Sequence, residues 1–291
     1  MHTMQLSGAP RHLKAGAFRL TLEHPLIMGV VNVTPDSFSD GGDFLDAGSA
    51  IAHAQRLIDE GVDILDIGGE SSRPGAASLP LEEELRRILP VLQACVPLGK
   101  PVSVDTCKPE VMRVAVEAGA SMLNDIWAFR REGALEAATA AATGRGVALC
   151  VMHMQRDPAT MQDNPHYDDV VAEVRDFLAC RIDALAQAGV LREQIVIDPG
   201  FGFGKSVEHN LALLRHLDRF AALGVPVLAG LSRKSTIGRI TGRTDPKDRV
   251  AGSIAAALLA AQNGATILRV HDVAATRDAL AIWTAVANEK T

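Results

Sequence analysis

Residues 26–33 read LIMGVVNV, a run of apolar and β-branched residues that leads into a polar stretch reaching Gly42. Residues 50–60 follow, with apolar side chains at the three- and four-residue spacing of an amphipathic helix. A buried strand that passes through polar residues into a helix is one unit of strand–helix alternation. This unit decides the fold because the same pattern recurs along the chain.

The sequence contains eight such apolar runs, and amphipathic stretches lie between them. The expected strands are residues 26–33, 64–67, 101–104, 122–124, 147–152, 195–198, 227–230 and 266–270. The expected helices are residues 50–60, 81–94, 110–118, 134–143, 167–188, 206–223 and 249–263. Such alternation implies parallel strands joined by right-handed crossovers. Eight units favour the α/β class and a closed (β/α)8 TIM barrel, with an open doubly wound sheet as the alternative.

The length of 291 residues suits a single barrel domain. We assign residues 26–291 to that domain and residues 1–25 to an N-terminal segment. A short hairpin over residues 17–22 would close the bottom of the barrel.

Composition limits the classes of partner and compartment. A net charge of −6 argues against general nucleic-acid binding, which needs a basic face. The four cysteines are widely spaced, which gives no disulfide framework and no zinc-ribbon pattern. Residues 1–25 show no signal peptide, and the longest apolar stretch, residues 254–261, is too short to cross a bilayer. We therefore expect a cytoplasmic protein that binds neither nucleic acid nor membrane.

Polar or ionisable residues follow every expected strand, and in a barrel these positions converge on one end. Asp66, Asp105 and Asp198 lie within or directly after buried-type runs. A carboxylate in such a place is costly unless it is paired or hydrogen-bonded. These aspartates are therefore candidates for a functional site, with structural salt bridges as the alternative.

Two further features suggest a ligand. Phe201 and Phe203 alternate with glycines, which allow close backbone approach while the rings cover a flat molecule; the alternative is a loop stapled to the core. Arg269 and His271 follow the last strand as two anion donors. Residues 200–205 match neither the Walker A nor the dinucleotide pattern, and the sequence has no zinc-protease or nucleophile-elbow motif.

Eight segments in order resemble the dihydropteroate synthase family, from residue 26 to the C-terminus. They are IMGVVNVTPDSFSDGG from residue 27, DIGGESSRPGA from 66, PVSVDT from 101, LNDI from 123, VMHMQ from 151, DPGFGFGKSVEHN from 198, LSRKS from 231 and RVHDV from 269. The resemblance implies a TIM barrel, usually a homodimer, that is a sulfonamide target. It implies Mg²⁺-dependent condensation of 6-hydroxymethyl-7,8-dihydropterin pyrophosphate with p-aminobenzoate, giving 7,8-dihydropteroate and pyrophosphate in folate biosynthesis.

The resemblance also implies a role for each matched residue. The pterin would be bound by Asp105, Asn124, Ile126, Met152, Asp198, Phe203 and Lys234. The pyrophosphate would be held by Asn32, Arg269 and His271, with Asn32 as a ligand of Mg²⁺. The p-aminobenzoate pocket would consist of Phe38, Ser72, Arg73, Pro74, Phe203 and Ser232. Catalysis would fall to Asp105, Lys234, Asp36 and Arg73. Ser72 stands where the family usually has threonine.

Two related functions remain as alternatives: a pterin-binding methyltransferase domain and a synthase-like subunit that no longer turns over. The loops at Asp36 and Arg73 and the block at residues 232–234 argue against the first, and the retained loop residues argue against the second. The expected helix over residues 249–263 is apolar on much of its circumference, whereas an outer barrel helix should have a polar face. We expect it to pack on a second copy of the chain, with burial under the termini as the alternative.

Overall fold

The computed structural model describes residues 11–33, 43–70 and 79–288, and at 43–46 and 287–288 it describes the backbone only. Its central feature is a parallel eight-stranded sheet with the strand order β8-β7-β6-β5-β4-β3-β10-β9. The strands are β3 (Leu26–Asn32), β4 (Ile64–Gly68), β5 (Val102–Asp105), β6 (Met122–Asp125), β7 (Ala148–Met152), β8 (Ile195–Asp198), β9 (Leu228–Ala229) and β10 (Ile267–Val270). A parallel bridge between Ile197 and Val227 joins the two outer strands. The predicted TIM barrel is confirmed, and the open doubly wound sheet is excluded.

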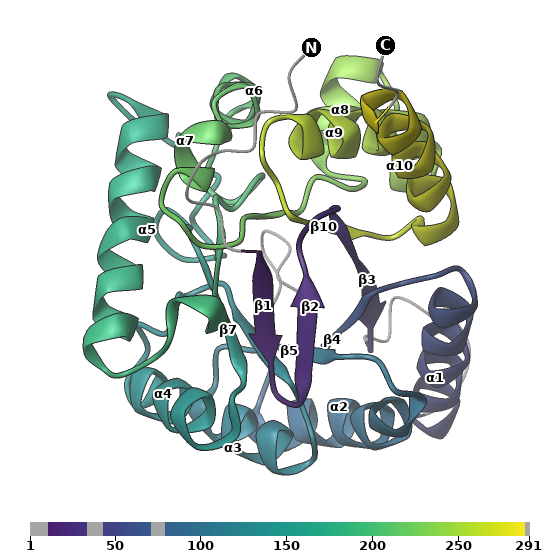
Figure 1. Cartoon of the computed structure of the whole chain (residues 1–291), viewed down its shortest axis with the longest axis vertical. Helices are drawn as coiled ribbons and strands as arrows, with labels where there is room; N and C mark the ends of the chain where they lie inside the picture. Colours follow the sequence, from purple (N-terminus) through teal and green to yellow (C-terminus); the bar gives the residue numbers. More distant parts are fainter. Residues whose placement is uncertain (1–10, 34–42, 71–78, 289–291) are drawn as a thin grey trace.

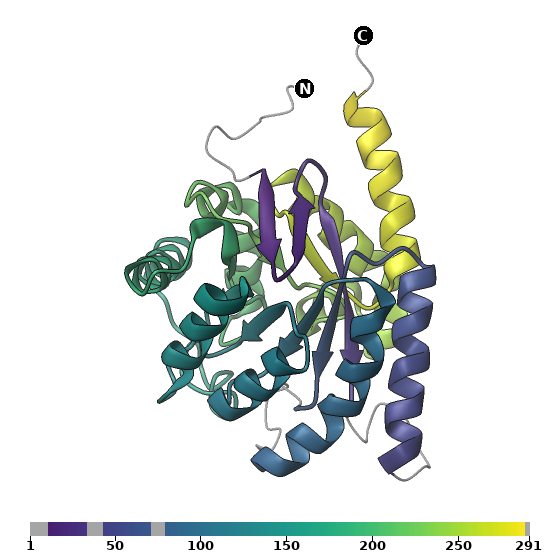
Figure 2. The ribbon, with the colours of Figure 1, turned by 60° about the horizontal axis from the view of Figure 1, so that its bottom comes forward.

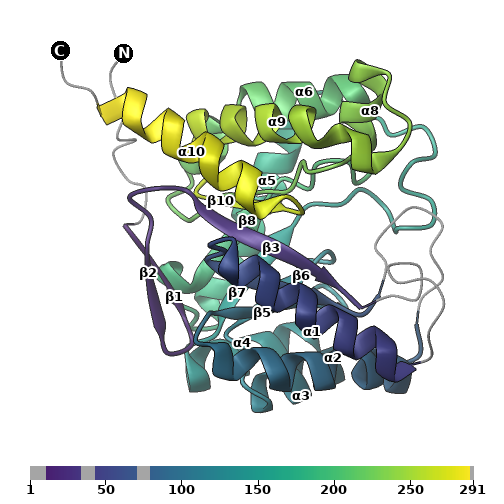
Figure 3. The same ribbon diagram turned by 90° about the vertical axis from the view of Figure 1, so that its right-hand side faces the viewer.

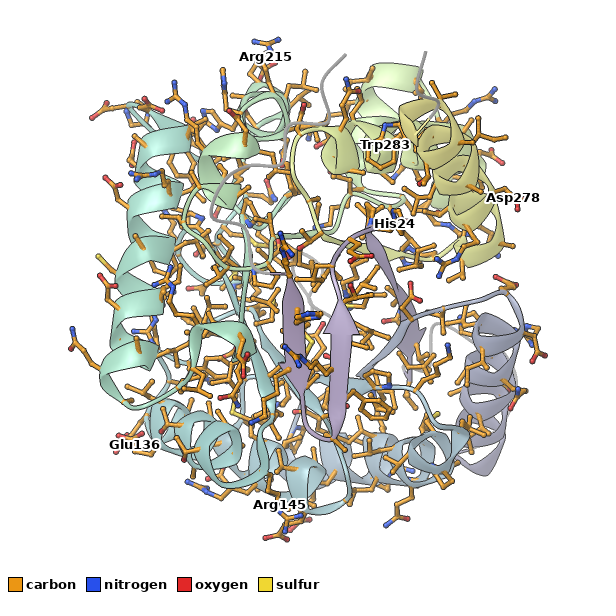
Figure 4. All side chains as sticks on the ribbon, in the orientation of Figure 1. His24, Glu136, Arg145, Arg215, Asp278 and Trp283 are labelled. Atoms are coloured by element: carbon orange, nitrogen blue, oxygen red, sulfur yellow. The ribbon has the colours of Figure 1, made fainter. Side chains whose placement is uncertain are left out.

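Helices form a ring outside the strands (Figure 1). They are α1 (Asp43–Asp59), α2 (Leu81–Cys95), α3 (Pro109–Glu117), α4 (Ala134–Arg145), α5 (Val170–Gln187), α6 (Val207–Arg215), α7 (Asp218–Ala221), α8 (Ser235–Thr241), α9 (Val250–Gln262) and α10 (Val273–Asn288). Short 3-10 turns are η2 (Val96–Leu98), η3 (Arg192–Gln194) and η4 (Pro246–Arg249). Charged side chains such as Glu136, Arg145, Arg215 and Asp278 point outward from this ring (Figure 4).

The single helix predicted over residues 206–223 is wrong, because the structure divides it into α6 and α7. The chain leaves the helical conformation at His216, which has φ −110° and ψ 31°. Beyond the break, Leu217 and Phe220 are fully buried, so the core holds the chain in a new direction.

The strands form because their residues are buried on both faces, as β4 and β7 are at every position. Outward-facing residues pack under the helices in the main core. Gly29 of β3 allows the neighbouring side chains to approach the strand closely, since a Cβ there would lie 2.9 Å from the side chains of Leu57 and Val62. Inward-facing residues form a second cluster in the barrel interior that includes Met28, Cys150 and Leu228.

An antiparallel hairpin of β1 (His12–Ala15) and β2 (Phe18–Thr21) covers one end of the barrel. Leu13 and Ala15 of β1 join the interior cluster and fill the barrel at that end. Figures 2 and 3 show the hairpin at the amino ends of the strands, while β3 runs toward the opposite end. That opposite end, where the carboxyl ends of the strands lie, is called the mouth below. In the part of the chain that the structure describes, no helix is long and apolar enough to span a membrane.

Candidate functional site

The ends of the strands bring together six residues that the sequence pointed to. Asn32 ends β3, Asp105 ends β5, Asn124 precedes the last residue of β6, Met152 ends β7, Asp198 ends β8, and Arg269 precedes the last residue of β10. Asp105 is in register with Asn124, which is in register with Cys150 of the interior cluster. Because residues in register on parallel strands share a face, these polar side chains point into the barrel. The mouth therefore has a polar floor above an apolar interior.

Arg269 joins two carboxylates across this floor. Its Nε donates to Oδ2 of Asp66 at 2.6 Å, and its Nη2 donates to Oδ2 of Asp105 at 3.1 Å. Asp66 of β4 is fully buried, and its other oxygen, Oδ1, has no hydrogen-bond partner among the described residues. The salt bridge proposed as an alternative role for the buried aspartates is thus present at Asp66. It orients a cation at the mouth.

The ion pairs change the ionisation of their members. Burial raises the pKa of Asp105 to about 7, with Arg269 opposing the rise and Asp66 adding to it. Burial disfavours the Arg269 cation, but the carboxylates of Asp66 and Asp105 outweigh it and raise the pKa of Arg269. Arg269 therefore stays charged, whereas Asp105 titrates near neutral pH. A carboxyl group with a shifted pKa in a partly open position is typical of a functional site.

Lys234 and Asp198 form a second charged group at the mouth. Lys234 Nζ donates to the carbonyl oxygen of Phe201 and lies 4.6 Å from the centroid of the Phe203 ring. Burial lowers the pKa of Lys234 to about 8 and raises the pKa of Asp198, while the charge of each opposes the other's shift. Asp198 Oδ1 also accepts a hydrogen bond from Gly200 N at 2.7 Å.

An apolar cluster lines the mouth beside these charges. Met152, Met154 and Met161 are buried, and Ile126, Trp127 and Phe203 pack against them. The structure thus brings together Ile126, Met152 and Phe203, as the sequence suggested for a flat ligand. Sequence reasoning missed Trp127, Met154 and Met161, although Met154 lies within the quoted segment VMHMQ.

Two residues with different expected roles are linked directly. Ser232 Oγ lies 3.2 Å from His271 N, which donates to it, and 3.0 Å from His271 Nδ1. The contact joins the end of β9 to the end of β10. Between Ser232 and Lys234, Arg233 has φ 59° and forms an ion pair with Asp272, with two hydrogen bonds of 2.5 and 3.1 Å.

Asp125 was also missed as a candidate. Burial raises its pKa to about 6, and its carboxylate accepts hydrogen bonds from Trp127 N at 2.8 Å and Phe129 N at 2.7 Å. It thereby holds the turn that presents Ile126 and Trp127 to the apolar cluster. The available signal was its place beside Asn124 at a strand end.

Five predicted residues cannot be placed. Asp36, Phe38, Ser72, Arg73 and Pro74 lie outside the described residues. Within the described ranges 11–33, 43–70 and 79–288, no group of three or more His, Cys, Asp or Glu side chains is arranged to hold a metal ion.

Comparisons with known proteins agree with this architecture. The family model for pterin binding enzymes matches residues 28–271. A dihydropteroate synthase of Neisseria meningitidis serogroup B is 50% identical over 283 residues, covering 95% of this chain and 98% of its own. A Xanthomonas albilineans dihydropteroate synthase solved with 4-aminobenzoic acid has a TM-score of 0.90 and 56% identity, covering 96% of this chain and 99% of that one. The Xanthomonas albilineans enzyme in complex with 7,8-dihydropteroate has a TM-score of 0.86 and 54% identity, covering 96% and 100%.

The barrel, its polar mouth and the match over most of the chain define a pterin-binding enzyme. More particularly, the chain belongs to the dihydropteroate synthase family, and its function is that of this transferase of folate biosynthesis. The methyltransferase and inactive-subunit alternatives are therefore set aside.

Proposed function

We propose that the mouth of this barrel condenses 6-hydroxymethyl-7,8-dihydropterin pyrophosphate with p-aminobenzoate, and that the residues assigned above carry the reaction. The observation that best supports the proposal is the Asp66–Arg269–Asp105 array at the mouth. It places a guanidinium, which can hold a phosphate, directly beside a carboxylate, which can accept from N–H donors. A substrate with a pyrophosphate at one end and a pterin at the other needs both.

The pterin would lie with its polar edge on the floor of the mouth. An aminopyrimidinone offers adjacent N–H donors, which match the acceptors of Asp105, Asn124 and Asp198. Ile126 and Met152 would contact its faces, with Phe203 closing the pocket and Lys234 donating a hydrogen bond. Bonding to such donors favours the ionised form of a carboxyl group and would lower the pKa of Asp105 below 7.

In the reaction the bond between the pterin methylene carbon and the pyrophosphate oxygen breaks, and its electron pair leaves with the oxygen. Asn32, Arg269 and His271 would stabilise the charge of the departing group. The ionised Asp105 would stabilise the positive charge left on the pterin. The neutral arylamine of p-aminobenzoate then attacks the carbon, and its proton leaves afterwards, so the step needs no strong base.

The p-aminobenzoate would lie beside Phe203 and Ser232. Its carboxylate would face the start of α8, near the Ser232 hydroxyl. The other proposed members of this pocket, Phe38, Ser72, Arg73 and Pro74, together with Asp36, belong to the undescribed ranges. A sulfonamide resembles p-aminobenzoate in shape, and we propose that it competes for this pocket.

Magnesium is the cofactor that we propose. The amide oxygen of Asn32 is a hard donor at the end of β3 and fits Mg²⁺, which is usually bound by one or two protein oxygens together with substrate phosphates and water. When bound, the ion would neutralise charge on the leaving pyrophosphate.

We further propose a homodimer in the cytoplasm. Large apolar side chains are exposed on α8, α9 and α10, namely Ile240, Leu259, Ile282 and Val286. These helices lie next to one another on one side of the barrel (Figure 3). An apolar surface over neighbouring helices favours a symmetric partner. The four free cysteines agree with a reducing compartment.

An omission experiment tests the proposed reaction. The purified chain is incubated with Mg²⁺, the pterin pyrophosphate and p-aminobenzoate, and pyrophosphate and 7,8-dihydropteroate are both quantified. The proposal requires equal amounts of the two products, and neither product when p-aminobenzoate, the pterin or Mg²⁺ is left out. Pterin binding without product would contradict the proposed reaction.

A further inference from the structure

The turn after β8 has an unusual set of hydrogen bonds. Four successive carbonyl oxygens each accept from a side chain: Phe201 from Lys234 Nζ, Gly202 from Gln162 Nε2 at 2.6 Å, Phe203 from Lys205 Nζ at 3.0 Å, and Gly204 from Tyr167 OH at 2.9 Å. Gly200, Gly202 and Gly204 have φ of 70°, 79° and 62°. The alternating left-handed glycines turn the carbonyls away from one another. Hydrogen bonds from these four side chains, three of them distant in sequence, therefore fix the shape of the turn.

Lys205 is the least exposed of these four donors. It is 4% exposed, and its Nζ lies 3.0 Å from His153 Nδ1, 3.3 Å from the His153 carbonyl oxygen and 3.0 Å from the Phe203 carbonyl oxygen. All these acceptors are uncharged, and no carboxylate among the described residues forms an ion pair with Lys205. The charge of Asp198 favours the ammonium of Lys205, but the two side chains form no ion pair. Burying an ammonium without a directly paired counter-charge is costly. Replacing buried charged groups by apolar side chains is often neutral or stabilising, so the lysine suggests a role beyond stability.

His153 can accept a hydrogen bond from Lys205. It is 8% exposed, and its ring stacks edge-on against Phe177, with centroids 5.0 Å apart. Burial, together with the charge of Lys205, lowers the pKa of His153 to about 2, so the ring stays neutral and Nδ1 can accept. Its backbone N–H donates to the Asp198 carbonyl oxygen at 3.0 Å. His153 thus ties the end of β7 both to β8 and to the turn.

The residue that this arrangement holds is Phe203. Its ring packs with Met152 and Ile126 in the apolar cluster and lies beside Lys234. Its carbonyl oxygen accepts a hydrogen bond from Lys205 Nζ. This bond restrains the backbone of Phe203 and therefore the position of its ring at the mouth. Gly200 lets the turn approach closely, since a Cβ there would lie 1.9 Å from the His153 carbonyl oxygen.

We propose that Lys205 and His153 are positioning residues of the pterin site, which fix the Phe203 carbonyl and hence the ring that closes the pocket. The inference rests on the proposed pterin contact of Phe203. It assigns a task to two residues that touch neither substrate. A variant without Lys205 keeps the Phe203 side chain but loses the hydrogen bond to its carbonyl oxygen. The ring is then held less firmly, and pterin binding is expected to weaken.

A double-mutant cycle separates this role from general destabilisation. The variants are Lys205→Met, Phe203→Ala and the two combined, and Lys14→Met on the hairpin is the matched control. The probe is 6-hydroxymethyl-7,8-dihydropterin pyrophosphate with Mg²⁺ and without p-aminobenzoate, and its dissociation constant is measured by calorimetry. Thermal melting checks that each variant is folded.

Lys205→Met is expected to weaken pterin binding ~10-fold, the size expected for one lost charge-assisted hydrogen bond. The double variant is expected to bind no more than ~2-fold more weakly than Phe203→Ala alone, because the lysine acts through that ring. Lys14→Met is expected to bind like the unmodified chain. Unchanged binding by Lys205→Met, or fully additive losses in the double variant, would overturn the inference.

His153→Leu serves if Lys205→Met does not fold. It removes the Nδ1 acceptor and leaves Lys205 two carbonyl acceptors, so a ~3-fold weaker affinity is expected that vanishes in the Phe203→Ala background. A loss that persists in that background would count against the inference. Failure of the proposed function is recognised separately, because the unmodified chain would then yield no dihydropteroate.

Discussion

Nε of Arg269 donates a hydrogen bond to Oδ2 of Asp66 at 2.6 Å, although the two residues lie 203 positions apart in the chain. The fully buried Asp66 fixes one edge of the guanidinium, and Asp105 accepts from another nitrogen. The cation therefore reaches the mouth in one defined orientation. A preorganised cation of this kind stabilises a leaving anion without reorganisation during the reaction.

Asp66→Asn tests the electrostatic link between the two aspartates. Burial is the main cause of the raised pKa of Asp105, and the Asp66 charge adds to it. Removing that charge lowers the pKa of Asp105, so the acid limb of kcat/KM against pH is expected to move to lower pH. The profile is measured for the variant and the unmodified chain in the same buffers. An unmoved acid limb would show that Asp105 does not control it.

The strands were predictable because burial on both faces leaves a clear apolar signature, and residues 195–198 match β8. The break between α6 and α7 could not be predicted, because the helical spacing of apolar residues continues through His216 and Leu217. Asp66, Asp105 and Asp198 stood out as carboxylates within buried runs. Their partners could not be found from the sequence, because the Asp66–Arg269 contact exists only once the barrel closes.

The backbone of Arg233 is expected to be strained. Its φ of 59° is a conformation that glycine adopts freely and alanine does not. Arg233→Ala should therefore be less stable than Arg233→Gly by about 1 kcal/mol in denaturant unfolding. Arg156, with φ 61°, is the matched control in an exposed loop. The same order is expected there, and the reverse order at Arg233 would mean that its backbone is not left-handed.

Lys205 should make stability depend on pH. Burial lowers its pKa from 10.5 to about 7, so between these values the unfolded chain binds more protons than the folded chain. The buried charge of Lys205 therefore destabilises the folded chain fully below pH 7, and this destabilisation decreases as the pH rises toward 10.5. The melting temperature of Lys205→Met minus that of the unmodified chain should therefore be largest below pH 7. A difference that is constant from pH 6 to 10 would contradict the buried charge.

The proposed dimer predicts unequal effects of two exposed leucines. Leu259 on α9 is 49% exposed, and Leu191 before η3 is 52% exposed. Leu259→Glu buries a charge in the proposed interface and should shift the chain to monomer in sedimentation velocity. Leu191→Glu should leave the mass unchanged. The proposed surface is wrong if both variants sediment like the unmodified chain.

The role of Asp105 is tested most directly by comparing the unmodified chain with Asp105→Asn under single-turnover conditions, with pyrophosphate and dihydropteroate followed together. The unmodified chain is expected to form both products in equal amounts. The variant is expected to react at least ~10²-fold more slowly, the size expected for an electrostatic contact made in the transition state, with an unchanged melting profile. Equal rates in the two proteins would contradict the assignment of catalysis to the barrel mouth.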